Sequence, residues 1–333
     1  MHHSCPTDPD EPDAPARTAV QELTGRVAGH EAAPRAPRHV LVPRTGSTND
    51  DLRSALTGVD GLLDLRAARA WPHLSSLRAV EQTAGRGRGA HVWTTPPRGA
   101  LTISFVLRPV VPLDRLAWLP LLAGLAIHDA LTEDACLAQR GWRVATKWPN
   151  DVVLLPAPES TCAGLDQVPG WGRARKVAGV LTELVLPAEA LGKADDAWRP
   201  QKRDQAPAVV LGIGLTVGQR PEQLPVDWAI SLAAAGWQVE VEEVAQRLAA
   251  HLARLVDQWE ADDGDPDRQG RHAGLGGRLR EVCWSLGRRV RVRTPAGVVR
   301  GEVIDLRPGL VLRGAQGEVL VQAGDVEEAR EGE

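Results

Sequence analysis

Short apolar runs of strand length alternate with longer helical patterns from about residue 39 to residue 262. Three of these runs are apolar and rich in β-branched residues, as strands in a sheet are: 100–107, 176–186 and 208–217. Two stretches have apolar residues at helical spacing: 113–131, where Pro120 is expected to introduce a kink, and 241–259. This alternation predicts a mixed α and β domain in which helices cover a sheet.

Segments rich in Pro, Gly and charge are expected to be loops: 156–175 and 187–207 within this domain, and 262–277 as a linker after it. Four short strands are then expected between turns that contain Pro or Gly: 289–293, 298–306, 310–313 and 318–321. Regular short strands of this kind predict a small barrel. Alternation points Val290 and Val292 inward, so we interpret the neighbouring arginines as a solvated face and not as a nucleic-acid patch.

Composition limits the classes of function. The formal net charge of -4 lacks the basic excess of a protein whose main partner is nucleic acid. Residues 1–37 are rich in Pro and acids with little apolar periodicity, which predicts a disordered tail and no secretory signal. Since no run of about 18 or more apolar residues occurs either, we expect a cytoplasmic protein without a membrane partner.

The segment AGRGRGAHVW at residues 84–93 differs from the common nucleotide-binding loops. It matches a relaxed dinucleotide fingerprint at Gly85, Gly87 and Ala90. A Rossmann loop opens a helix, however, whereas a tryptophan, two threonines and two prolines follow here. A Gly-Lys-Ser or Gly-Lys-Thr ending would define a Walker loop, and this segment has neither.

What this segment offers is a pliable backbone that carries two forked donors. Its glycines relax the constraints on the backbone, and the Arg86 and Arg88 guanidinium groups suit the oxygens of carboxylates and phosphates. We therefore expect a cationic loop that closes over an anion. A surface loop without a ligand is the alternative.

Lys147 stands out because the 39 basic residues comprise 35 arginines and only four lysines. It ends an expected strand, 143–147, and precedes a turn at Trp148 and Pro149. An ammonium is a compact point charge that a guanidinium does not replace. Held on a strand end beside a tryptophan that excludes water, it is well placed to bind a carboxylate or a phosphate. A structural salt bridge is the alternative.

The stretch TGSTNDD at residues 45–51 combines hydroxyls and an amide with acidic residues. Ser47 or Thr48 is expected to cap a helix that begins near Asp50, because a helix start favours a hydroxyl followed by an acidic first turn. Capping occupies one side chain, so the other polar groups remain free for a ligand.

Together these segments resemble the biotin protein ligase family. The elements occur in a fixed order: GSTN at 46–49, Gln82 with AGRGR at 84–88, Trp93, KWPND at 147–151, KVAGVLTE at 176–183 and GIGLTV at 212–217. The resemblance covers roughly residues 39–330 and implies an α+β fold: a mixed sheet with helices, related to class II aminoacyl-tRNA synthetases, followed by an SH3-like β-barrel. The implied organisation is a disordered tail at 1–37, a catalytic domain at 38–275 and an SH3-like domain at 280–330.

The resemblance also implies an ATP-dependent ligase. Such an enzyme activates biotin with ATP to biotinyl-5′-AMP, with Mg²⁺ on the nucleotide, and transfers biotin to a lysine of the biotin carboxyl carrier domain of a carboxylase. A lipoate or octanoate ligase and a non-catalytic biotin-binding paralogue are the alternatives. Residues 1–37 leave no room for a helix-turn-helix, so no DNA partner is expected, and both a monomer and a homodimer remain open.

Carried over by motif position, eight residues are implied to hold biotin: Ser47, Thr48, Asn49, Gln82, Arg86, Gly87, Arg88 and Lys147. Of these, Lys147 and Arg88 are the implied catalytic residues. Trp93 and Asn150 are implied to contact the nucleotide, and Gly179 to line the biotin pocket through its backbone. The implied site has no metal held by the protein alone.

Two departures from the family pattern concern the nucleotide. Ala90 and His91 stand where the family commonly has Gly-Arg, so one phosphate-facing charge is missing or depends on pH. Thr216 stands where the family usually has Asn, and a hydroxyl cannot copy an amide with two donors. We therefore expect altered contacts to the nucleotide.

Overall fold

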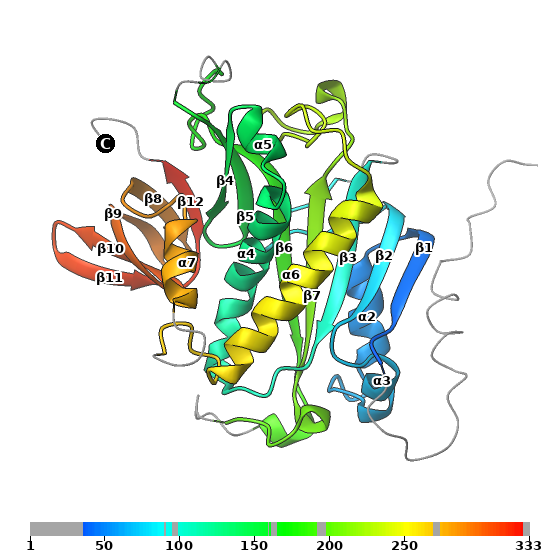
Figure 1. Ribbon diagram of the computed structural model, residues 1–333. Coiled ribbons are helices and arrows are strands. Elements are labelled where there is room, and N and C mark those ends of the chain that lie inside the picture. The colour runs from blue at the N-terminus through cyan, green and yellow to red at the C-terminus, as the bar shows by residue number, and fades with distance from the viewer. Residues whose placement is uncertain are drawn as a thin grey trace, which may run out of the picture.

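A seven-stranded mixed sheet organises the larger part of the structure (Figure 1). The structure is a computed structural model that describes residues 36–89, 91–94, 99–158, 160, 165–191, 198–268 and 274–328. The strands, in spatial order, are β1 (His39–Thr45), β2 (Ser75–Gln82), β3 (Ala100–Leu107), β7 (Ala208–Thr216), β6 (Arg175–Val185), β5 (Asp151–Pro156) and β4 (Trp142–Lys147). β1 and β2 run parallel, and all other neighbouring pairs of this sheet are antiparallel.

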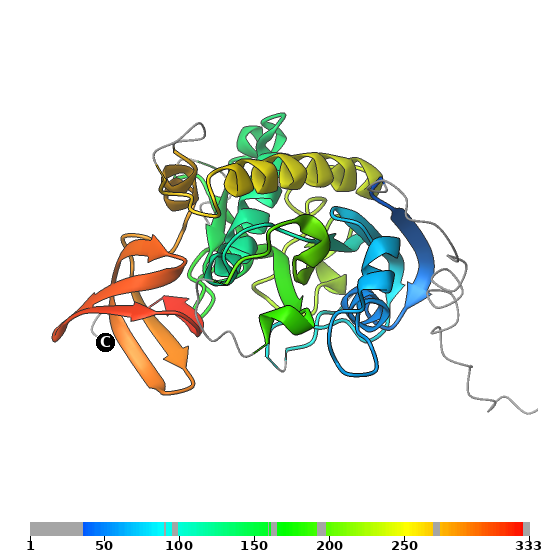
Figure 2. The same ribbon diagram turned by 90° about the horizontal axis from the view of Figure 1, so that it is seen from below.

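Helices cover both faces of the sheet (Figure 1), whereas the sequence pattern predicted helical cover without assigning it to faces. α4 (Leu119–Thr132) and α6 (Val241–Ala261) lie side by side on one face, and α2 (Thr48–Leu56) and α3 (Leu65–Ala70) pack on the other, near β1 and β2 (Figures 1 and 2). β3 lies between them and is buried along its whole length. Its side chains alternate, because Leu101, Ile103, Phe105 and Leu107 join the α4 and α6 core while Ser104 faces α2.

The helical predictions were right in kind, and one was wrong in detail. Apolar residues of α6 at the expected spacing are buried: Val244, Leu248, Leu252, Leu255 and Trp259. The expected single helix over 113–131 is instead a 3₁₀ helix, Leu113–Trp118, followed by α4. Pro120 does not kink a helix but lies in the first turn of α4, where its missing N–H leaves no hydrogen bond unmade.

The C-terminal part is a second, antiparallel sheet. Its strands, in spatial order, are β11 (Gly317–Val321), β10 (Gly309–Gly314), β9 (Gly297–Arg307), β8 (Arg289–Thr294) and β12 (Asp325–Glu328). The four expected strands are confirmed, and Val290 and Val292 are buried as expected. β12 was not expected, because its sequence, DVEE, has a single apolar residue. Strand number and pairing agree with the implied SH3-like domain, and we call β8–β12 the C-terminal sheet.

The two sheets are joined directly. α7 (Leu275–Glu281) begins within the expected linker at 262–277 and extends beyond it, and residues 269–273 of that linker are outside the described part. Residues 282–284 then run along the edge of β4, where Thr146 N donates to Val282 O (2.8 Å) and Trp284 N donates to Thr146 O (2.7 Å). The C-terminal sheet is therefore fixed beside the strand that ends at Lys147 (Figure 1).

Two further expectations concern the N-terminal tail and membrane-spanning helices. The predicted tail at 1–37 lies almost wholly outside the described residues, which begin at 36. Among the helices of the described residues, none has the length and apolar character needed to cross a bilayer.

Candidate active site

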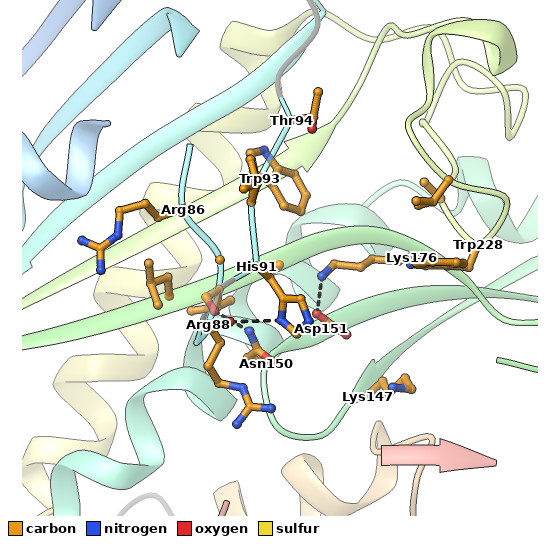
Figure 3. A pocket seen from close by; sticks show the side chains of 18 of the residues that line it. Arg86, Arg88, His91, Trp93, Thr94, Lys147, Asn150, Asp151, Lys176 and Trp228 are labelled. Atoms are coloured by element: carbon orange, nitrogen blue, oxygen red, sulfur yellow. Dashed lines mark hydrogen bonds and ion pairs between the residues drawn. The ribbon is translucent and has the colours of Figure 1, made fainter. Parts of the chain in front are cut away.

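A cavity of about 620 Å³ is lined by residues of β2, β4, β6 and β7, by the start of α2, and by β8 and β12 of the C-terminal sheet. Every site residue predicted from the sequence lines it: Ser47, Thr48, Asn49, Gln82, Arg86, Gly87, Arg88, Trp93, Lys147 and Asn150. Gly179, expected to contribute through its backbone, lines it as well. Segments separated by about a hundred residues thus converge on one space (Figure 3).

One end of the cavity is formed by the start of α2. Ser47 is the N-cap residue and its Oγ accepts from the Asp50 N–H (3.4 Å), so the predicted cap is confirmed. Gln82 Oε1 accepts from both the N–H (2.9 Å) and the Oγ1 (3.2 Å) of Thr48. The carbonyl of Gln82 is thereby occupied, and its amide NH₂ is left as the donor.

Asn49 is committed to the protein itself. Its Oδ1 accepts from Ser104 Oγ (2.7 Å), and its Nδ2 donates to Glu183 Oε2 (3.0 Å) and to Leu181 O (3.4 Å). A buried amide with these partners fixes α2 against β3 and β6. The geometry therefore gives Asn49 a supporting position in the cavity wall, and its predicted contact with a ligand stays a prediction.

The glycine-rich segment forms a hairpin whose two arginines are held on different sides. Gly87 N donates to His91 O (2.8 Å), and Trp93 N donates to Gly85 O (3.0 Å). Arg86 donates to Asp50 and to Glu183 Oε1 (3.0 Å), and the hydrogen bond to Asp50 raises the pKa of the guanidinium.

The second arginine, Arg88, reaches the C-terminal sheet. It donates to Gly324 O (2.7 Å) and to the Asp325 carboxylate. Ala90, one of the two departures in this segment, lies outside the described residues. His91 is described, and its Nδ1 lies 3.0 Å from Arg88 O.

Trp93 closes the side of the cavity formed by β6 and β7. Its indole lies over Gly179 and Gly214, which are cross-strand partners. A Cβ on Gly214 would lie 2.3 Å from Trp93 Cε2, so only glycine lets the ring approach the sheet so closely. Among the described residues the buried Trp93 Nε1 has no hydrogen-bond partner, which leaves a donor for a ligand.

Lys147 lies deep at the boundary with the C-terminal sheet. Its side chain is 5% exposed, its Nζ donates to Val326 O (2.8 Å), and the Trp171 ring centroid is 4.2 Å away. Burial lowers the pKa of this ammonium, and the nearby Asp151 carboxylate opposes that effect. The predicted lysine is therefore at the cavity, with one carbonyl and one aromatic face around its charge.

Lys176 is a second cavity lysine that sequence reasoning missed. Its Nζ lies 2.6 Å from Asp151 Oδ1 and 5.4 Å from the Trp93 ring centroid, and it points into the cavity (Figure 3). The signal was available, because lysines are rare in this chain and Lys176 begins the KVAGVLTE stretch. The same scarcity that singled out Lys147 applies to it.

Two tryptophans extend the wall beyond the predicted residues. Trp171 and Trp228 line the cavity and stack with a centroid distance of 5.9 Å and an interplanar angle of 9°. Trp171 belongs to the 156–175 insert, which was expected to be a loop, and the composition of that insert gave no sign that it reaches the cavity. Thr216 anchors the segment that carries Trp228, since its buried Oγ1 lies 2.9 Å from Val177 O and 2.5 Å from Ile230 O.

The fold and the site define the class of protein to which this chain is similar. The profile described as the biotin/lipoate A/B protein ligase family matches residues 61–193. In fold, the chain is similar to a biotin protein ligase from Aquifex aeolicus solved in complex with biotin and ATP, with a TM-score of 0.59 and 21% identity over 88% of this chain and 99% of that one. The α+β fold implied by the sequence is confirmed.

Sequence similarity narrows this class to one family. The chain is 31% identical over 294 residues to the biotin acetyl-CoA-carboxylase ligase of Mycobacterium tuberculosis, covering 86% of this chain and 87% of that protein. It is 29% identical over 293 residues to the corresponding ligase of Paracoccus denitrificans, covering 86% and 98%. The chain belongs to the biotin protein ligase family.

Proposed function

We propose that this chain activates biotin with ATP to biotinyl-5′-AMP and transfers the biotinyl group to a lysine of a biotin carboxyl carrier domain. Besides family membership, one observation supports this function. A single cavity joins an end with neutral polar groups, at Thr48 and Gln82, to an end with two lysines and Arg88. The first suits an uncharged ring with amide-like groups, and the second suits a carboxylate meeting a triphosphate.

The first chemical step explains why cations are needed. A carboxylate oxygen of biotin attacks the α-phosphorus of ATP, the bond from that phosphorus to the bridging oxygen of the β-phosphate breaks, and pyrophosphate leaves. Two unit charges brought to 4 Å at an effective dielectric constant of 20 repel by about 4 kcal/mol. Ammonium and guanidinium groups fixed in the cavity offset this repulsion without having to reorganise.

The second step transfers the acyl group. A deprotonated lysine amine of the carrier domain attacks the acyl carbon, the bond from that carbon to the AMP oxygen breaks, and AMP leaves as the amine loses a proton. No nucleophile of the ligase takes part in either step. The cavity must therefore hold the adenylate until the carrier arrives, and we assign this role to the hairpin with Arg86 and Arg88 and to Trp93.

Within the cavity we divide the roles by chemistry. Biotin would lie at the Thr48 and Gln82 end, and its carboxylate would point toward the lysines. Lys176 is placed to meet the carboxylate and α-phosphate because its Nζ faces the open cavity beside Asp151. Lys147, deeper and without a carboxylate at ion-pair distance in the described part of the chain, would take a further phosphate oxygen.

A magnesium ion bound with ATP fits the residues present. Mg²⁺ prefers oxygen ligands and commonly binds through one or two carboxylates together with substrate phosphates. Asp151 offers such a carboxylate at the cavity wall, and the neighbouring Asn150 is fixed by donating to Val180 O (2.7 Å). When bound, the ion would neutralise charge on the phosphates.

The activity is tested by pyrophosphate release from ATP with biotin, lipoate or octanoate as the acid. We expect release with biotin only, and labelling of a purified carrier domain that is absent when its acceptor lysine is changed to Arg. Equal release with lipoate would establish a ligase of the other substrate class. Tight biotin binding without pyrophosphate release would establish a non-catalytic binder.

For its setting and partners, we propose a cytoplasmic ligase that acts as a monomer or homodimer and has no DNA partner. The net charge of -4 supports the last point, because specific DNA binding generally depends on a basic surface. Gel-shift assays at increasing salt test it, and sequence-specific binding that survives physiological salt would contradict it.

A further inference from the structure

The insert between β5 and β6 reaches the cavity through a tight turn. Val168 N donates to Gly172 O (2.8 Å) and Gly172 N donates to Val168 O (2.8 Å), which closes a loop with Trp171 at its end. Gly172 has φ +56°, a conformation that favours glycine. Arg175 Nη2 donates to Asp166 O (2.7 Å), so the turn is also fixed at its base.

This turn is seated against the C-terminal sheet. The Glu328 N–H of β12 donates to Gly170 O (3.1 Å), and a Cβ on Gly172 would lie 2.2 Å from Glu328 Oε2. On its other side, Trp171 stacks on Trp228. The position of the Trp171 ring is therefore determined by the insert, by β12 and by the segment that follows β7.

The ring placed in this way faces the Lys147 ammonium. Nζ lies 4.2 Å from the ring centroid, which is within the range of a cation–π interaction. Nζ also donates to the Val326 carbonyl oxygen, and no carboxylate of the described residues is within ion-pair distance. An aromatic face and one carbonyl stabilise a buried positive charge without cancelling it, so the charge remains available to an anionic ligand.

We propose that Trp171 is a positioning residue for the ligase reaction, and that its ring holds Lys147 charged and free of a carboxylate at the cavity wall. The inference deepens the proposed function and rests on it, because it gives Lys147 a role toward substrate phosphate. It also assigns the turn at 168–172 to the active site. Trp171 itself is not a catalytic residue, since it acts through Lys147.

Two substitutions of similar size separate the aromatic face from the filling of space. Trp171→Phe retains a ring under the ammonium, whereas Trp171→Leu leaves a comparable void without one. Other charged groups around Lys147 are the same in both variants: Asp151, Lys176, Asp325 and Glu327. Any difference between the two variants therefore reports on the ring. Trp171→Met replaces the Leu variant if the latter does not fold.

The direct measurement is an NMR titration of protein labelled with ¹³C-lysine, which has only four lysine side chains to resolve. The Lys147 signal is assigned by its absence in Lys147→Arg. We expect the Lys147 pKa in Trp171→Leu to lie about 0.5 to 1.5 units below that in Trp171→Phe, because the lost interaction stabilised the charged form. Identical titrations in the two variants would overturn the proposal.

The kinetic measurement uses biotin-dependent pyrophosphate release as a function of pH. In Trp171→Leu we expect kcat to fall about three- to tenfold and its alkaline limb to move to lower pH, while Trp171→Phe stays within about twofold of the unchanged protein. A raised KM for ATP with unchanged kcat would overturn the proposal and make Trp171 a nucleotide contact. Failure of the unchanged protein to release pyrophosphate would refute the proposed function instead, and the NMR titration would still test the contact.

Discussion

Arg88 donates hydrogen bonds to the Asp325 carboxylate and to the Gly324 carbonyl oxygen (2.7 Å), although Arg88 and Asp325 are 237 positions apart in the sequence. The contact ties the tip of the glycine-rich hairpin to β12. Arg88 and Asp325 both line the cavity, so the C-terminal sheet completes its wall. The contact therefore holds the hairpin over the space where we place the adenylate.

Replacing Asp325 by Asn should speed the escape of biotinyl-5′-AMP modestly. The two side chains are 34% and 56% exposed, and exposed ion pairs contribute about 0.2 to 1 kcal/mol, so release should quicken by at most about fivefold. Arg88→Ala should speed the release of biotinyl-5′-AMP tenfold or more, because it also removes the proposed contact with the phosphate. Dissociation of radiolabelled adenylate measures both.

The matched control for this prediction is Glu318→Gln. It breaks the Arg313–Glu318 ion pair, which joins β10 and β11 in the same sheet and lies outside the cavity. If Glu318→Gln and Asp325→Asn had the same effect on release, the Arg88 contact would have no special role in retention.

The two cavity lysines should both be required for adenylate formation. We expect Lys176→Ala and Lys147→Ala each to lower the rate about 10²- to 10³-fold, which is the usual cost of removing one preorganised group that stabilises developing charge. Rapid-quench measurement of pyrophosphate release checks this. Lys202→Ala is the control, because that side chain is 65% exposed and pairs with Asp204 (3.2 Å). A full rate in either cavity variant would remove that lysine from the proposed site.

Filling the slot under Trp93 should weaken biotin binding. In Gly214→Ala the new Cβ would lie 2.3 Å from the indole, so the ring must move away from the sheet. We expect calorimetry to show biotin affinity reduced about tenfold or more. Gly277→Ala adds the same methyl group to α7, where no atom lies within 4 Å, and should leave affinity unchanged. Equal affinities in the two variants would mean that Trp93 does not bound the biotin site.

Much of the cavity was predictable because its residues occur in short motifs at strand ends. GSTN follows β1, and KWPND joins the end of β4 to the start of β5, so the two motifs lie at opposite edges of the seven-stranded sheet. Ser47 shows what local reasoning can predict. Its capping role depends only on the first turn of the helix that follows, and the structure confirms it. The fold class was equally readable, because burial follows the period of each strand and helix.

What could not be predicted depends on contacts between distant segments. The amide of Asn49 is committed to Ser104 and Glu183, which lie 55 and 134 positions away. β12 has too little apolar pattern to reveal a strand, and Trp171 lies in an insert whose composition indicates only a loop. Their positions follow from the packing of the C-terminal sheet against β4, which no local pattern encodes.

The docking of α7 should make stability depend on pH through Asp129 of α4. This carboxylate is 10% exposed and accepts from Arg278 (2.8 Å) and Arg254 (3.0 Å). Burial by itself would raise its pKa, but hydrogen bonds from His128 and Arg278 outweigh burial and lower the pKa to about 2. A lowered pKa stabilises the fold above the unfolded value of 3.8, and that stability is lost as pH falls toward 2.

The size of this effect follows from the shift of nearly two units, which corresponds to about 2 kcal/mol of unfolding free energy. Asp129→Asn should therefore lose about 2 kcal/mol or more at pH 7 and show a smaller decline between pH 4 and pH 2 than the unchanged protein. Urea unfolding across this range measures it. Asp305, whose pKa is also lowered to about 2, is present in both proteins, so only their difference reports on Asp129. The control is Asp114→Asn, at a carboxylate that is 44% exposed, and its stability should depend on pH as that of the unchanged protein does. If the free energy of unfolding of Asp129→Asn ran parallel to that of the unchanged protein across this pH range, the Asp129 cluster would not hold α7 in place.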